Sequence, residues 1–194
     1  IDVMHVTKNL CVTLLGFLGM YGKTKDTPEA REDQQRMHGK DGIHQGQASY
    51  ALTKGAKEIF SECLLSMKVP SGFLSNIKGI INMAEKKFQN LKSHDCHVIM
   101  TQLLPVGLRG LLLKNVRLAI VKLCAFLNTI SQKVIEPEII PRLRCDVVQC
   151  LVSFELVFPP SFFNIMTHVL VHLADEIVIL GPVFLHNMFP FERF

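Results

Sequence analysis

The first residues with a chemically useful spacing are Asp2 and His5, which lie three positions apart. A helix would place this carboxylate and imidazole on one face. In that arrangement the pair can hold a metal ion or orient a catalytic group. The same pattern is typical of an ordinary helix start with a capping aspartate, and from the residues alone we favour that interpretation.

A second group consists of four potential ligands in a row, His94, Asp95, Cys96 and His97. Neighbouring residues on a helix cannot all face one ion, and structural zinc sites use separated pairs of ligands. The sequence contains no CxxC motif. We therefore favour the polar start of a helix here and keep a metal site as the alternative.

The third group is His168 and His172, at the i and i+4 spacing that lets two imidazoles share a metal ion. Residue 169 is Val, however, whereas the zinc-protease motif requires Glu at that position. Because apolar residues 169–171 separate the two histidines, the pattern favours partly buried, hydrogen-bonded side chains.

Near the end of the chain, Glu192 lies within an aromatic run. A carboxylate in such surroundings needs a partner. The simple partner is the adjacent Arg193, and the chemically interesting one is a divalent cation.

Composition restricts the class of protein. With 48% hydrophobic and 20% charged residues in 194, the chain is globular. Its apolar runs, such as 177–185, are too short to span a membrane, and six cysteines without a signal peptide indicate reduced thiols. Phosphate-loop, GxGxxG and GxSxG motifs are absent from the sequence. Residues 1–92 have 13 Lys or Arg against 9 Asp or Glu, an excess too diffuse to predict a nucleic-acid surface.

The elements that must position these residues are mainly helical. Apolar residues recur at three- and four-residue spacing, whereas residues 23–50 are polar and rich in glycine. We therefore predict an all-α bundle and leave a minor β element open. The secondary structure of 73–88 stays open, Pro105 is expected to break a helix, and Ser161 to cap one. The ranges predicted to be helical are 1–20, 29–37, 54–67, 93–103, 115–127, 137–158 and 162–175.

Both ends of the sequence suggest that it is a piece of a longer chain. It begins with Ile1 and stops in the aromatic run, whereas domains usually end in polar segments. The mean hydropathy of +0.27 agrees, because a fragment exposes surfaces that missing parts would cover.

Seven ordered motifs, taken together, resemble one family. They are DVMHVTKN (2–9), GKTKD (22–26), KSHDCH (92–97), LPV (104–106), KNVR (114–117), FPPSFF (158–163), and GPV with MFPFER (181–183 and 188–193). The family is the transposase of plant CACTA (En/Spm-type) DNA transposons.

This resemblance implies a division of the chain. Residues 1–22 resemble the end of the transposase catalytic domain, 23–52 form a polar linker, and 53–194 resemble the helical domain of unknown function that follows. The predicted bundle would then be the helical insertion and flanks of a truncated RNase H-like core.

The family also implies cut-and-paste chemistry in the nucleus on DNA with terminal inverted repeats. Three acidic residues hold Mg²⁺ or Mn²⁺. By this resemblance Asp2 and His5 match an acid-x-x-His element, and Glu192 is the candidate third acid and metal ligand. Because the first acid, and the second as well on this mapping, would precede residue 1, we expect no catalysis and no cofactor for this fragment alone.

The expected partners are DNA in the longer protein, and self-association or an accessory transposon protein; no membrane is expected. Two alternatives stay open. One is a non-catalytic helical interaction module that uses the apolar stripes 116–127 and 140–154. The other is a small zinc-binding structural domain, whose candidate ligands are His94, Cys96, His97, His168 and His172.

Overall fold

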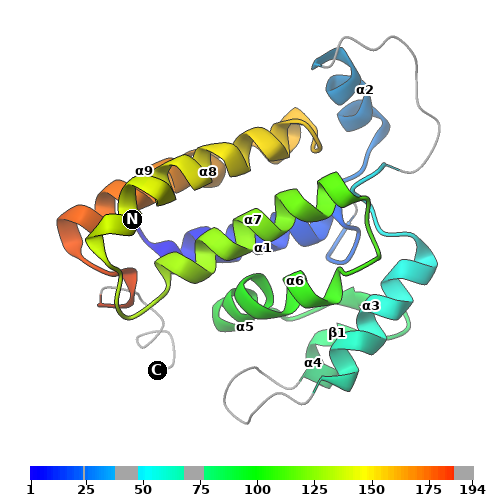
Figure 1. Ribbon diagram of the computed structural model, residues 1–194. Coiled ribbons are helices and arrows are strands. Elements are labelled where there is room, and N and C mark those ends of the chain that lie inside the picture. The colour runs from blue at the N-terminus through cyan, green and yellow to red at the C-terminus, as the bar shows by residue number, and fades with distance from the viewer. Residues whose placement is uncertain (24, 38–47, 68–76, 186–194) are drawn as a thin grey trace.

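The computed structural model describes residues 1–23, 25–37, 48–67 and 77–185, and the protein is mainly helical in these ranges, as predicted (Figure 1). The helices before the hairpin are α1 (Val3–Phe17), α2 (Pro28–Met37), α3 (Lys54–Ser66) and α4 (Ile77–Ile80). The hairpin has strands β1 (Ile81–Asn82) and β2 (Lys87–Phe88). The later helices are α5 (Ser93–Val98), α6 (Leu104–Gly107), α7 (Lys114–Ile130), α8 (Ile140–Glu155) and α9 (Ile165–Leu180).

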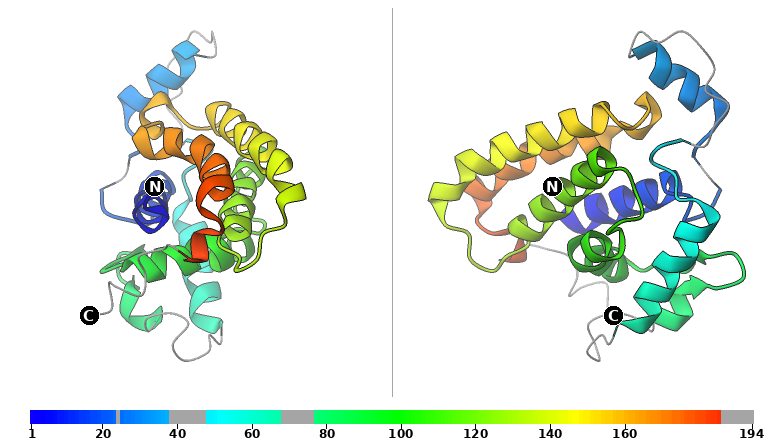
Figure 2. Two further views of the ribbon diagram at one scale, coloured as in Figure 1. Left: turned by 90° about the vertical axis from the view of Figure 1, so that its left-hand side faces the viewer. Right: turned by 45° about the vertical axis from the view of Figure 1, so that its right-hand side comes forward.

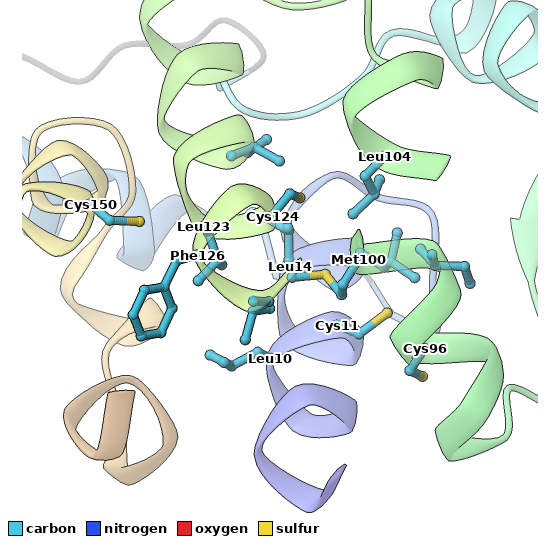
Figure 3. Close-up of a cluster of buried hydrophobic side chains, with 14 of the residues drawn as sticks. Leu10, Cys11, Leu14, Cys96, Met100, Leu104, Leu123, Cys124, Phe126 and Cys150 are labelled. Atoms are coloured by element: carbon cyan, nitrogen blue, oxygen red, sulfur yellow. The ribbon is translucent and has the colours of Figure 1, made fainter. Parts of the chain in front are cut away.

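Helix α1 runs through the middle of the molecule. It packs against α5 on one side and α9 on another, and the other long helices continue the bundle by packing α7 on α8 and α8 on α9 (Figure 2). A single hydrophobic core connects these helices. Its centre contains Leu10 and Leu14 of α1, Met100, and Leu123 of α7 (Figure 3).

The polar segment after α1 returns to this core. Tyr50 is fully buried and stacks on Phe158, with the ring centroids 5.2 Å apart. Phe17 of α1 meets the Tyr50 ring edge-on at 5.6 Å. Residues from 1–22, from the predicted linker and from 53–194 therefore share one core. The boundaries at 22 and 53 remain a prediction about domain organisation in a longer protein.

Pro105 does not break a helix, so this expectation was wrong. The chain continues from α5 through a π-helix, Ile99–Leu103, into the first turn of α6, where Pro105 lies. Proline lacks an N–H and its ring clashes with the carbonyl four residues earlier in a regular α-helix. The wider π turn places that carbonyl elsewhere, so the helical path continues.

The start of α9 also differs from the prediction. Residues Pro160–Phe162 form a short 3-10 helix, and Asn164 caps α9 by accepting a hydrogen bond from the Met166 N–H at 2.8 Å. Ser161 is therefore not the cap. Both asparagine and serine are good capping residues, so sequence alone did not distinguish them.

The ambiguous range 73–88 forms α4 and the β1–β2 hairpin in its described part, with Ile81 paired to Phe88. Of all the helices in the described ranges, none is both long and apolar enough to cross a membrane.

Candidate functional site

Asp2 is the capping residue of α1. Its Oδ1 accepts a hydrogen bond from the His5 backbone N–H at 3.2 Å, and both residues are exposed. The pair therefore has the geometry of a helix start. Glu192 lies outside the described residues, so its relation to Asp2 stays a prediction.

The four consecutive candidates at α5 have separate surroundings. Asp95 is buried and accepts a hydrogen bond from the Lys92 backbone N–H at 3.1 Å, which fixes the start of the helix. Cys96 is buried in the core beside Cys11 (Figure 3). Burial, with a smaller effect of the nearby His94, lowers the pKa of His97 to about 4. In the described part of the chain, no three His, Cys, Asp or Glu residues form a group that could hold a metal.

Four core positions are occupied by cysteine thiols, Cys11, Cys96, Cys124 and Cys150, and all are buried. Burial raises the pKa of Cys11 well above its usual range and that of Cys150 to about 12. Because thiolates are the reactive form, these thiols are suited to packing rather than to nucleophilic chemistry. Cys145 is the contrasting case, because it is exposed on α8.

His168 and His172 are exposed on α9, so the expectation that they are partly buried was wrong. The Nε2 atoms of the two rings lie 3.3 Å apart. The apolar residues between them face inward or sideways on the helix, and both imidazoles share one outer face. The expectation that they are hydrogen-bonded is met by the contact between the two rings.

A cationic surface that the sequence did not predict lies at the loop after α1. Three segments meet there, because Leu52 N–H donates to Leu18 O at 3.2 Å and Phe88 N–H donates to Met20 O at 2.7 Å. These backbone bonds bring the start of α3 and strand β2 to residues 18–23. We call Lys23, Lys57 and Lys87 the loop-lysine cluster.

Two members of the loop-lysine cluster contact the loop backbone directly. Lys87 Nζ donates to Gly22 O at 2.7 Å. Lys57 Nζ lies so close to Gly19 that a Cβ built there would be only 2.7 Å from it. Gly19 has a φ of +74°, so glycine suits both the backbone conformation and the close approach.

Lys57 and Lys87 of this cluster have no carboxylate partner in the part of the chain that the structure describes. Partial burial, and then the charge of Lys87, lower the pKa of Lys57. Among the described residues, neither Lys57 nor Lys87 has an ion pair, whereas the neighbouring Lys86 pairs with Glu58 at 2.5 Å. The arrangement therefore presents unneutralised ammonium groups around one loop, which suits an anion.

The loop-lysine cluster could not be predicted from the sequence because its members come from distant parts of the chain. The GKTKD motif contains Lys23, but Lys57 and Lys87 reach the loop only through the fold. The net charge of residues 1–92 indicated an excess of positive charge, but it did not indicate where in the fold that charge lies.

Comparison with known families gives a match in the last third of the chain. Residues 130–194 match the model of a domain of unknown function, DUF4218. This range begins at the last residue of α7 and includes α8 and α9. Neither the curated proteins nor the solved structures include a match to the chain.

Proposed function

We propose that the chain is a DNA-contacting, non-catalytic part of a CACTA-type transposase that acts in the nucleus. The seven ordered motifs support the family assignment. The DUF4218 match at residues 130–194 agrees with the expectation that the later part of the chain is a domain of unknown function. The mainly helical fold is compatible with an insertion in an RNase H-like core.

The observation that carries the DNA-contacting role is the loop-lysine cluster. Lys57 and Lys87 present ammonium groups to one loop without carboxylate neutralisation in the described ranges. Lysine side chains that face phosphates release counterions from DNA, and this release supplies most of the sequence-independent affinity. The cluster would thus hold the DNA backbone and leave sequence recognition to other parts of the longer transposase.

Catalysis is assigned to the longer protein. There, Mg²⁺ or Mn²⁺ held by three acids would activate water or a 3′-hydroxyl. In the present chain Asp2 uses one carboxylate oxygen to cap α1. By the resemblance, Asp2 belongs to the acid-x-x-His element and Glu192 is the candidate third acid, so we expect no strand cleavage by these 194 residues alone.

The DNA-contacting role is tested by fluorescence anisotropy with a labelled duplex of mixed sequence. We expect the double variant Lys57→Gln/Lys87→Gln to bind about tenfold more weakly than the unmodified chain in low salt, since two phosphate contacts are lost. A control, Lys133→Gln/Arg142→Gln, removes one cation just after α7 and one in the first turn of α8. Equal losses in both variants would contradict a specific role for the cluster.

The assignment of Glu192 is tested separately in a full-length transposase that contains this sequence. Glu192→Gln should abolish excision of a reporter transposon, whereas Glu155→Gln, on an exposed part of α8, should leave it intact. Excision by the Glu192→Gln protein would show that the third acid lies elsewhere.

A second candidate function is protein interaction by the helices. The apolar stripes 116–127 and 140–154, which the sequence suggested for protein interaction, are largely in the core. They include the buried residues Val116, Ile120 and Val147. A different strip, formed by Val148 and Val152 of α8 and by Leu156 just after it, is about half exposed or more. If self-association uses it, Val152→Lys should shift a concentration-dependent dimer to monomer in light scattering; an unchanged mass would argue against this role.

A further inference from the structure

The exposed histidines of α9 bring two ring nitrogens together at a separation slightly longer than the usual hydrogen bond. His168 and His172 lie on successive turns, and their Nε2 atoms are 3.3 Å apart. Most N–H hydrogen bonds in proteins are shorter, with donor–acceptor distances of about 2.9–3.0 Å. The ring centroids are 5.0 Å apart and the rings are inclined at 71°, so the rings do not stack face to face.

The same separation fits two ligands of one metal ion. Zinc binds imidazole nitrogen at about 2.0–2.1 Å in tetrahedral sites, which places two such nitrogens about 3.3–3.4 Å apart. The two Nε2 atoms therefore already have the spacing of a chelating pair. They need no change of helix geometry, because both residues project from the same side of α9.

We propose that His168 and His172 form a surface site for a divalent transition-metal ion, with Zn²⁺ as the principal occupant. Imidazole suits Zn²⁺, Cu²⁺ and Ni²⁺, whereas Mg²⁺ prefers oxygen ligands. The remaining coordination positions are filled by water or by a donor from a bound partner. This site is separate from the Mg²⁺ or Mn²⁺ expected for transposition and does not depend on the proposed function.

The protonation states required for binding are accessible. A neutral imidazole has one N–H, and the proton can occupy either ring nitrogen. Binding needs both Nε2 lone pairs, so the ring that donates in the His–His hydrogen bond moves its proton to Nδ1. Two neutral histidines can therefore accept the ion without a net loss of protons.

Two acidic residues follow His172 on the same side of α9, Asp175 at i+3 and Glu176 at i+4, and Glu176 pairs with the N-terminal ammonium of Ile1. Asp175 is also paired. It forms an ion pair with Arg144 of α8. In the described residues no third His, Cys, Asp or Glu joins the two histidines. The site is therefore a two-ligand chelate, weaker than a structural zinc centre and open to a third donor.

The test is calorimetric titration of the intact chain with Zn²⁺ alone. We expect one ion per chain, and each of His168→Gln and His172→Gln should weaken its affinity at least tenfold, because the chelating second ligand is lost. The control is Glu155→Gln, which changes an exposed residue of α8 and leaves the pair in place. Circular dichroism establishes that each variant remains folded.

A second measurement identifies the atoms that bind. In histidine-ring NMR spectra, Zn²⁺ should shift the signals of His168 and His172 and leave that of His5 in place. The proposal is overturned if the unmodified chain does not bind Zn²⁺, if the double variant His168→Gln/His172→Gln binds it equally well, or if His94 and His97 shift instead.

Discussion

At the scale of single residues, small changes in side-chain volume decide whether elements fit. Gly107 is buried in α6, and a Cβ built on it would lie 2.5 Å from the Phe60 ring of α3. Phe60 is fully buried, so the ring has little room to move. Glycine is therefore needed at position 107 because of this close contact, and not because of its backbone freedom.

We predict that Gly107→Ala lowers the free energy of unfolding by about 1–3 kcal/mol, as overpacking of a core does. Gly55→Ala is the control, because no atom lies within 4 Å of a Cβ built there. It should keep or slightly raise stability. Urea denaturation measures both, and an unchanged Gly107→Ala protein would show that Phe60 repacks freely.

His97 gives a prediction about pH. Burial and His94 lower its pKa from 6.5 to about 4, so the unfolded chain binds a proton in this interval that the folded chain does not. The contribution of His97 to the free energy of unfolding is therefore fully present above about pH 6.5. It is lost as the pH decreases towards 4, by up to about 3 kcal/mol. Urea denaturation at several pH values gives the slope of the unfolding free energy against pH. This slope should be shallower in His97→Gln than in the unmodified chain; an identical slope would assign the effect to other groups.

At the scale of elements, periodicity located the long helices well because each buries one apolar stripe. The stripes of α7 and α8 contain the buried residues Ile120, Leu123, Leu143 and Val147, as their spacing predicted. Element ends were less predictable. At Pro105 the π-helix offset the missing N–H, and at α9 two capping residues stood close together in sequence.

The start of α9 can be tested by a matched pair of substitutions. Asn164→Ala removes the side chain that accepts from Met166 N–H and should cost about 0.5–2 kcal/mol of stability. Ser161→Ala alters an exposed residue of the preceding turn and should change stability by less than about 0.5 kcal/mol. The reverse order of effects in thermal unfolding would restore Ser161 as the cap.

At the scale of the whole molecule, one core joins parts of the chain that sequence analysis separated. The segment 23–52 looked like a linker because its composition is polar, yet Tyr50 lies between Phe17 and Phe158. Composition averages over a segment and does not reveal one buried aromatic residue. The loop-lysine cluster was unpredictable for a related reason, since only tertiary contacts bring its members together.

Because most of the cysteines lie in the common core, we predict a sharp difference in reactivity between the exposed and the buried thiols. Iodoacetamide should modify Cys145 rapidly in the folded protein, while the buried Cys11, Cys96, Cys124 and Cys150 react only after unfolding. Partly buried Cys63 should react at an intermediate rate. Mass spectrometry of digested protein measures each site, and early modification of Cys11 would indicate that α1 separates from α5.

Whether the loop-lysine cluster holds DNA phosphates, as we propose, can be decided from the dependence of DNA affinity on salt. Each phosphate contact contributes about −0.9 to the slope of log affinity against log salt concentration. The account predicts that Lys57→Gln/Lys87→Gln reduces the magnitude of this slope by about 1.8, with little change in Lys133→Gln/Arg142→Gln. The same slope in the cluster variant and the unmodified chain would contradict it.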